Sequence, residues 1–240
     1  PTVAFTNALF LAAQDGPNSD NARVYMSRVQ DMLGPNAGRH PAFDSSDMEE
    51  GHIWVIAETG LGPILTERRL DLPIPYDGNP LLLSMAFPNV DRRPNSVSLN
   101  RYTINNAQLS FVELADMNKL VRTEFSKRWP AIATRQVVSA FTKAAIQRTA
   151  DGENVYLGLA TKLFTAAVTK ADTRMWSLTP DKWSVAKLKT PDDAMLTINY
   201  GAQTMTVPIV PESAIVYIKQ PTGRARPYVE VLPLTRGSAR

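Results

Sequence analysis

Short runs rich in apolar residues recur along most of the chain and predict β-strands, and the run at 64–72 alternates, with the charged residues Glu67, Arg69 and Asp71 on the opposite face. In the first half they occupy 52–58, 64–72, 81–87, 97–104 and 108–114. In the second half they occupy 183–188, 195–200, 204–210, 214–219 and 228–232. The run at 81–87 is almost continuously apolar, which is typical of a strand buried on both faces. Asn105-Asn106 and the segment 201–203 predict tight hairpin turns.

Steps of three and four residues between apolar positions predict two short helices at the start of the chain. The first runs to about Gln14, and Ser19 or Asp20 can cap the second, which ends at Gly34-Pro35. A helix pair of this size with an Asp-Gly turn resembles one tetratricopeptide (TPR) unit, and an ordinary helical hairpin is the other interpretation. A single TPR-like unit cannot bury its own faces, so we expect a neighbouring repeat or domain to cover it.

The segment 116–170 predicts a helical pair with a pause at Asp151-Gly152. Pro130 cannot donate a backbone hydrogen bond, so the first arm is either two helices that meet at Trp129-Pro130 or one kinked helix. We favour the break, with Pro130 in the first turn of the second segment. The apolar side chains of this arm are expected to form one stripe: Leu120, Val121, Phe125, Trp129, Ile132, Val137, Val138, Phe141, Ala144 and Ala145.

Basic side chains are expected on the face of this helix opposite the apolar stripe. They are Lys119, Arg122, Lys127, Arg128, Arg135, Lys143 and Arg148. Asp116 and Glu124 are the acidic residues through Ala150, so seven positive and two negative charges leave +5 here, against +3 for the whole chain. The alternatives are a solvated face, a surface for a partner protein or anionic lipid, and a nucleic-acid site. Nucleic-acid binding ranks last, because the aromatic residues fall on the apolar stripe and are not interleaved with the basic ones.

Together these patterns predict an α+β protein with an N-terminal TPR-like helix pair, a β-rich body that contains an inserted helical pair, and a C-terminal β-sandwich-like unit. The expected boundaries are 1–50 for the helical hairpin and acidic loop, 51–180 for the β-rich region with helices at about 116–170, and 181–240 for the sandwich-like unit packed on the preceding region.

The amino-acid composition limits the kinds of chemistry that this chain can carry out. The 240 residues are 44% hydrophobic and 20% charged, which is typical of a globular chain, and the eighteen prolines favour short strands. There are no cysteines, which excludes disulfides, thiolate catalysis and cysteine-ligated metals for this chain. No apolar stretch reaches the ~18–20 residues that a membrane-spanning helix needs. We expect residue 1 to be the start of a piece of a longer protein.

No catalytic, cofactor or metal site is predicted. His40 and His52 lie near the acidic residues Asp44, Asp47, Glu49 and Glu50, but the His-Glu-x-x-His spacing is absent, and both histidines are expected in solvent, one in a loop and one at a strand edge. Gly60-Leu61-Gly62 lacks the third glycine of a phosphate-binding loop and favours a turn.

Asp172, Arg174 and Trp176 form the most distinctive polar cluster. One interpretation is catalytic, in which Asp172 supplies an active-site carboxylate. We favour a structural role, in which an Arg–carboxylate fork caps a helix and ties the connector to a sheet.

Four segments in a fixed order carry a likeness to a known family: Glu58 to Pro75, Ser84 to Pro88, Trp129 to Arg135 and Ala171 to Pro180. With the TPR-like start, the chain resembles a family of bacterial envelope proteins described as TPR-containing lipoproteins of unknown function. The resemblance implies an exported bacterial protein in the periplasm, tethered to the outer membrane through an upstream lipidated cysteine. This chain itself contains no such cysteine.

The function expected from these observations is a non-catalytic structural or adaptor component of a bacterial envelope assembly, such as a secretion or motility machine. Its partners would be other protein subunits, with peripheral contact to membrane lipid as a further expectation, and no small-molecule substrate is identified. The alternative is an envelope enzyme that acts on peptidoglycan or polysaccharide through Asp172 and other carboxylates. A nucleic-acid-binding protein is the third.

Overall fold

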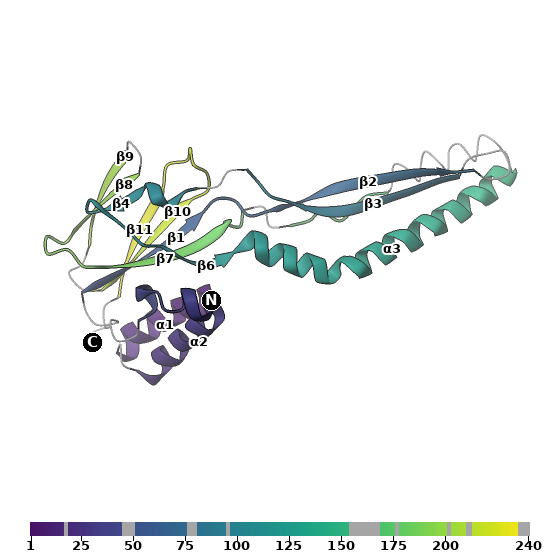
Figure 1. Cartoon of the computed structure of the whole chain (residues 1–240). Coiled ribbons are helices and arrows are strands. Elements are labelled where there is room, and N and C mark those ends of the chain that lie inside the picture. The colour runs from purple at the N-terminus through teal and green to yellow at the C-terminus, as the bar shows by residue number, and fades with distance from the viewer. Residues whose placement is uncertain are drawn as a thin grey trace, which may run out of the picture. The chain divides into compact units, whose positions relative to one another are not determined.

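The computed structural model describes residues 1–16, 19–44, 51–75, 81–94, 97–153, 169–175, 178–200, 203–209 and 213–234. It confirms a mixed α+β protein with an N-terminal helix pair (Figure 1). The chain divides into two compact units, each built from separate stretches of sequence. Unit 1 contains 1–62, 94–117 and 178–240, and unit 2 contains 63–93 and 118–177.

Unit 1 is organised around a five-stranded sheet in the order β11-β10-β1-β7-β6. Its strands are β1 (His52–Thr59), β6 (Val112–Asp116), β7 (Lys182–Lys189), β10 (Ala214–Gln220) and β11 (Tyr228–Pro233). The central strand β1 pairs in parallel with β10 and antiparallel with β7. Three strands after residue 181 (β7, β10 and β11) therefore share a sheet with a strand from the first quarter of the chain, which differs from the predicted boundary of a separate unit at 181–240.

The second sheet of unit 1 has four strands in the order β5-β4-β8-β9. They are β4 (Tyr102–Ile104), β5 (Ala107–Gln108), β8 (Met195–Tyr200) and β9 (Gln203–Pro208). Asn105 and Asn106 have φ values of 50° and 62°, as the predicted tight turn requires. The strand expected at 97–104 is shorter, because residues Leu99–Arg101 form a 3₁₀ turn (η3) before β4 begins.

Both faces of the five-stranded sheet are covered within unit 1. Alternate residues of β1 and β10, such as Val55 and Val216, pack with Tyr102 and Leu196 of the second sheet. The other face, which includes Trp54, packs against the N-terminal helices. Because successive strand residues point to opposite faces, one central strand can supply side chains to two hydrophobic cores.

The N-terminal helices are α1 (Thr2–Asp15) and α2 (Asp20–Ala37), followed by a 3₁₀ turn, η1 (Pro41–Phe43). The Ser19 hydroxyl accepts a hydrogen bond from the Ala22 N–H at 3.3 Å, which confirms the predicted cap of α2. Gly34 ends the regular part of α2 with a φ of 77°, a conformation that favours glycine. Phe5 and Phe43 pack edge to face with ring centroids 5.6 Å apart in the core under the sheet.

Unit 2 consists of a long antiparallel hairpin and a long helix that lies along it (Figure 1). The hairpin strands are β2 (Ile64–Ile74) and β3 (Leu81–Asp91), and the helix is α3 (Met117–Glu153). The predicted break at Pro130 is wrong, because α3 continues through that residue. A proline costs a helix one backbone hydrogen bond and some steric strain, which the packing of the flanking turns on the hairpin can offset. The second arm of the predicted pair lies in 154–168, outside the described residues.

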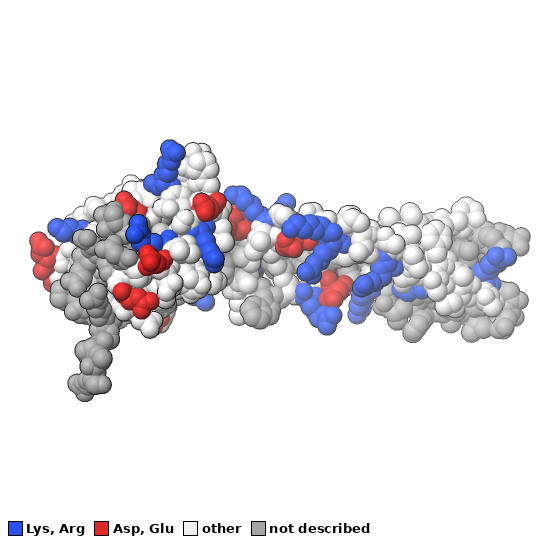
Figure 2. Space-filling model, turned by 90° about the horizontal axis from the view of Figure 1, so that it is seen from below, with Lys and Arg blue, Asp and Glu red and all other residues white. Residues whose placement is uncertain are grey.

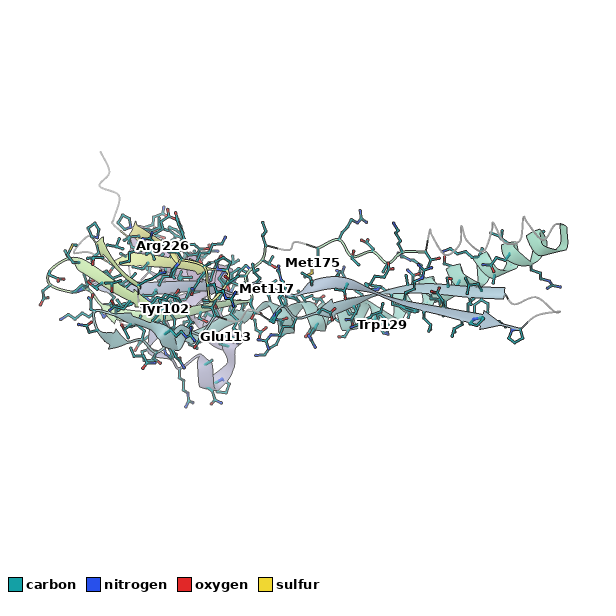
Figure 3. All side chains as sticks on the ribbon, turned by 90° about the horizontal axis from the view of Figure 1, so that it is seen from above. Tyr102, Glu113, Met117, Trp129, Met175 and Arg226 are labelled. Atoms are coloured by element: carbon teal, nitrogen blue, oxygen red, sulfur yellow. The ribbon has the colours of Figure 1, made fainter. Side chains whose placement is uncertain are left out.

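The contacts between α3 and the hairpin run along β3. Leu83 and Met85 form a buried cluster with Ala140 and Ala144, whose small side chains let the helix approach the sheet closely. Phe87 packs against Trp129 with ring centroids 5.7 Å apart (Figure 3 labels Trp129). These contacts hold several turns of α3 against strand β3.

Candidate interaction surface

The apolar residues of α3 occupy two faces, not the single stripe predicted from the sequence. Phe125 and Ile132 are half-buried and Ala144 is buried on the hairpin side. Val138 and Phe141 are each 59% exposed. The sequence pattern missed this because α-helix neighbours turn by about 100°, so steps of three to five residues connect both faces when many positions are apolar.

The outward face carries an apolar row in which all residues are exposed. It consists of the apolar residues Ala131, Val138, Phe141 and Ala145 together with Thr134, whose hydroxyl donates to the Pro130 carbonyl at 2.9 Å, and is called the α3 seam below. Its steps of three, four, three and four residues are those of the contact positions in a coiled coil. The residues at its two ends, Ala131 and Ala145, are small, so the seam leaves room there for the side chains of a second helix.

The predicted basic residues lie around α3 instead of on one face. Lys143 is half-buried and its Nζ donates to the Thr169 hydroxyl at 2.8 Å, on the hairpin side of the helix. The other six residues of the predicted surface are exposed. Lys127 continues the line of the seam toward the N-terminus and forms an ion pair of 2.7 Å with Glu124. The prediction of a single basic face is therefore wrong for Lys143.

Arginines accompany the seam along one edge. Arg128 and Arg135 lie seven residues apart, about two turns, and both are exposed. Figure 2 shows Lys and Arg side chains spread along this part of the molecule, with fewer acidic ones between them. The outward side of α3 thus combines exposed apolar groups with an excess of positive charge.

The Asp172 and Arg174 side chains form an ion pair with each other through two hydrogen bonds. The Arg174 Nη2 lies 2.9 Å from Asp172 Oδ2, and its Nε donates to Asp172 Oδ1 at 2.9 Å. Both side chains are largely exposed. The hydrogen bonds from Arg174 lower the pKa of Asp172 to about 2, so this carboxylate is ionised and already paired.

The predicted role of this fork as a tie to the sheet is wrong, because both of its partners belong to the same exposed loop. The loop is joined to the hairpin by Ala171, the residue before Asp172, whose N–H donates to the Glu67 carboxylate of β2 at 2.7 Å. Trp176, the third residue of the predicted cluster, lies outside the described residues.

The two histidines are half-buried, so the expectation that both lie in solvent is wrong. His40 caps the 3₁₀ turn η1, because its Nδ1 accepts from the Ala42 N–H at 3.2 Å while its Nε2 lies 3.1 Å from the Ser110 hydroxyl. His52 lies in β1 with its ring 6.3 Å from that of Trp54. Among the described residues no group of acidic and histidine side chains is arranged to hold a metal ion, and Asp47, Glu49 and Glu50 lie outside them.

The His40 cap makes the stability of the protein depend on pH. Burial, and then the positive charge of Lys187, lower the pKa of His40 below its usual 6.5. Between the lowered folded pKa and 6.5 the unfolded chain binds more protons, so the free energy of unfolding rises with pH and falls as pH drops below about 6.5. Protonation also removes the Nδ1 lone pair that accepts from Ala42.

Urea denaturation at pH 7.5 and pH 5 measures this effect. The wild-type protein is expected to lose stability between the two, and the His40→Asn variant is expected to lose less. Identical losses in both proteins would contradict a contribution from His40.

The Gly60-Leu61-Gly62 segment has a structural role. The Gly62 N–H donates to the Thr179 carbonyl at 2.8 Å, and Gly60 has a φ of 72°. A Cβ on Gly62 would lie 2.8 Å from the Thr179 hydroxyl and 3.2 Å from the Pro180 carbonyl. The glycines therefore allow two backbones to meet, as the predicted turn requires.

A small cavity in unit 1 was not foreseen from the sequence. Its volume is ≈ 320 Å³, and Ile198, Tyr200 and Arg226 are among the residues that line it. They come from β8 and from the loop before β11, nearly thirty residues apart along the chain. No spacing rule connects such positions, so the sequence carried no signal for this site.

Comparison with protein-family models, with curated proteins and with solved structures finds no match for this chain. Function has to be inferred from the chemistry of the surfaces just described. Among the helices in the described part of the chain, none has the length and apolar character needed to cross a membrane.

Proposed function

We propose that the protein is a non-catalytic structural or adaptor component of a bacterial envelope assembly, and that the α3 seam docks another subunit. The observation that carries the proposal is the exposure of Val138 and Phe141 on a helix that the hairpin already supports. Exposed apolar side chains in a continuous row are costly in water and are typical of a surface that a partner covers. A supported helix also pays little ordering entropy when it binds.

The occupant that fits best is a helix of another protein with acidic residues beside its apolar row. The spacing and small residues of the seam favour a helix over a flat surface. Arg128 and Arg135 lie along the edge of the seam, so carboxylates on the partner would complement their positive charges. A second copy of α3 would instead bring like charges together, because Glu124 is the only acidic residue in 117–150 and is paired with Lys127.

The N-terminal pair adds a second expected contact. Val3, Phe10, Val24 and Met32 of α1 and α2 are all more than half exposed. In the proposed arrangement the pair is one TPR-like unit, and these side chains pack on a neighbouring helical repeat. In the same proposal the C-terminal strands are part of a sandwich-like body within unit 1.

The residues that a catalytic interpretation would use have structural roles in the fold. Asp172 is exposed and paired with Arg174, and His40 caps a 3₁₀ turn. An enzyme that cuts peptidoglycan or polysaccharide would need free carboxylates grouped in a cleft. The resemblance to envelope lipoproteins supports the setting in the periplasm, at the outer membrane.

Site-specific photo-cross-linking tests the proposal. Benzoylphenylalanine is placed at Phe141 in the full chain, in the cells that produce it, and at Tyr228 as a matched control with a similar exposed fraction, 57% against 59%. The expected result is a cross-link from position 141, absent from position 228, to a helical segment rich in Asp and Glu. Fractionation should recover the product with the cell envelope.

Substitutions at the same two positions test whether the exposed Phe141 side chain contributes to partner binding. Phe141→Glu is expected to weaken partner binding by about 30-fold or more, as loss of a central anchor does, while Tyr228→Glu leaves it unchanged. Stability of Phe141→Glu should stay within about 0.5 kcal/mol of wild type, because the side chain is exposed. Cross-links only to phospholipid, only to a second copy, or to nothing would each overturn the assignment of an acidic helical partner.

A further inference from the structure

The cavity in unit 1 has the make-up of a small-molecule site. Ile198, Met205 and Val229 provide apolar wall, Tyr200 provides an aromatic face, and Gln203 and Arg226 provide polar groups. Its volume of ≈ 320 Å³ lies at the small end of the range for ligand pockets, ~300–1,000 Å³. The lining combines apolar surface with a somewhat larger polar surface, so convergent polar groups can fix the orientation of a bound ligand.

The loop that carries Arg226 is held in place by two buried or half-buried side chains. Gln220 is fully buried, accepts from the Tyr102 hydroxyl at 2.7 Å, and donates to the Ala225 carbonyl at 2.9 Å. The Tyr200 hydroxyl donates to the Gly223 carbonyl at 3.2 Å. These bonds fix the loop on both sides of Arg224, so Arg226 is presented from an ordered backbone.

Tyr200 belongs both to the wall of the cavity and to this support. Its ring lies 4.7 Å from that of Tyr102, centroid to centroid (Figure 3 labels Tyr102 and Arg226). Burial raises the pKa of Tyr102, so its hydroxyl keeps its proton and remains a donor to Gln220. The chain Tyr102–Gln220–Ala225 thus links the core to the residue beside Arg226.

The charge at the cavity is positive and uncompensated. Residues 195–209, which contain β8 and β9, include no charged side chain, and the loop 221–227 contains Arg224 and Arg226 but no acidic residue. No acidic side chain lines the cavity among the described residues. A guanidinium in this setting matches a carboxylate or phosphate group, which it can bind through two parallel hydrogen bonds.

We propose that this cavity binds a small organic acid, with its carboxylate on Arg226 and its apolar or aromatic part against Tyr200, Met205 and Val229. Phosphate esters share the anionic chemistry and are the second arm of the test. The site lies within unit 1 and does not rest on the α3 seam. It gives the protein a ligand-dependent function in addition to docking.

Methyl-detected NMR on the full chain, with benzoate as the probe, tests the site. Benzoate is expected to shift the Met205, Ile198 and Val229 methyl resonances with a saturating curve, and benzamide, its neutral analogue, to bind at least tenfold more weakly. Arg226→Gln should weaken benzoate binding at least tenfold, as expected for loss of a charge-assisted contact. Arg224→Gln is the matched control on the same loop, and should change it less than twofold.

A second variant separates positioning from charge. Tyr200→Phe keeps the aromatic wall but loses the bond to Gly223, and is expected to weaken benzoate binding several-fold while the remaining methyl resonances stay in place. Phenyl phosphate in place of benzoate distinguishes the two anions, and tighter binding of phenyl phosphate would overturn the choice of a carboxylate. Equal losses in Arg226→Gln and Arg224→Gln, or no saturable shifts with benzoate, would overturn the site.

Discussion

Replacing Gln147 by leucine is expected to destabilise the hairpin–helix unit by about 2–4 kcal/mol. The Gln147 side chain is fully buried, its Nε2 donates to the Leu82 carbonyl at 3.1 Å, and its Oε1 accepts from the Leu82 N–H at 3.1 Å. The amide therefore stands in for a neighbouring strand at the outer edge of β3. Leucine would leave two backbone groups buried beneath α3 without partners, at about 1–3 kcal/mol each in the least relaxed case.

The measurement is hydrogen exchange of the Leu82 amide together with urea denaturation of the intact chain. Gln136→Leu is the matched control: Gln136 is half-buried on the same helix, and its side chain forms no hydrogen bond within the described part of the chain. The Leu82 amide should exchange much faster in the Gln147 variant and at the wild-type rate in the control. Similar exchange rates in the two variants would contradict the role of Gln147 as a strand substitute.

The elements of this fold were largely predictable, because each is encoded by local patterns. The short apolar runs at 52–58 and 214–219 predicted strands at the positions of β1 and β10, and Ser19 marked the start of α2. The turn sequences predicted the hairpin pairs β4–β5 and β8–β9, but pairing between strands far apart in the chain was not predictable. β1 and β10 lie side by side although some 160 residues separate them, and nothing in either strand specifies its neighbour. The same limit explains why the sequence predicts a separate C-terminal unit that begins at residue 181.

The candidate surface was only partly predictable, for a related reason. Lys119 to Arg148 were correctly placed on a helix, but which side of α3 is covered depends on the hairpin, which lies far away in sequence. Val138 and Phe141 were therefore predicted to share one stripe with the residues that the hairpin buries, and Lys143 was predicted on the basic surface. The cavity at Arg226 was missed entirely, since its walls come from β8, β9 and β11 and from a loop between them.

The largest single-residue effect is expected at Trp54. Its side chain is 1% exposed in the centre of β1, and its Nε1 donates to the Ala42 carbonyl at 3.3 Å, so it joins the sheet to the turn after α2. Trp54→Ala should lower the free energy of unfolding by about 3–5 kcal/mol through lost burial and the cavity left behind. Trp54→Phe keeps an aromatic ring and loses the hydrogen bond, and should cost about 1–2 kcal/mol.

Urea midpoints of the intact chain measure both losses, with Trp129→Ala as the comparison. Trp129 is 39% exposed and packs on Phe87 and Phe125 at one side only, so its removal should cost roughly 1 kcal/mol. If Trp54→Ala does not fold, the graded loss in Trp54→Phe still reports on the same contacts. A smaller loss for Trp54→Ala than for Trp129→Ala would show that the sheet does not depend on its N-terminal helices, because Trp54 is the largest side chain buried between them.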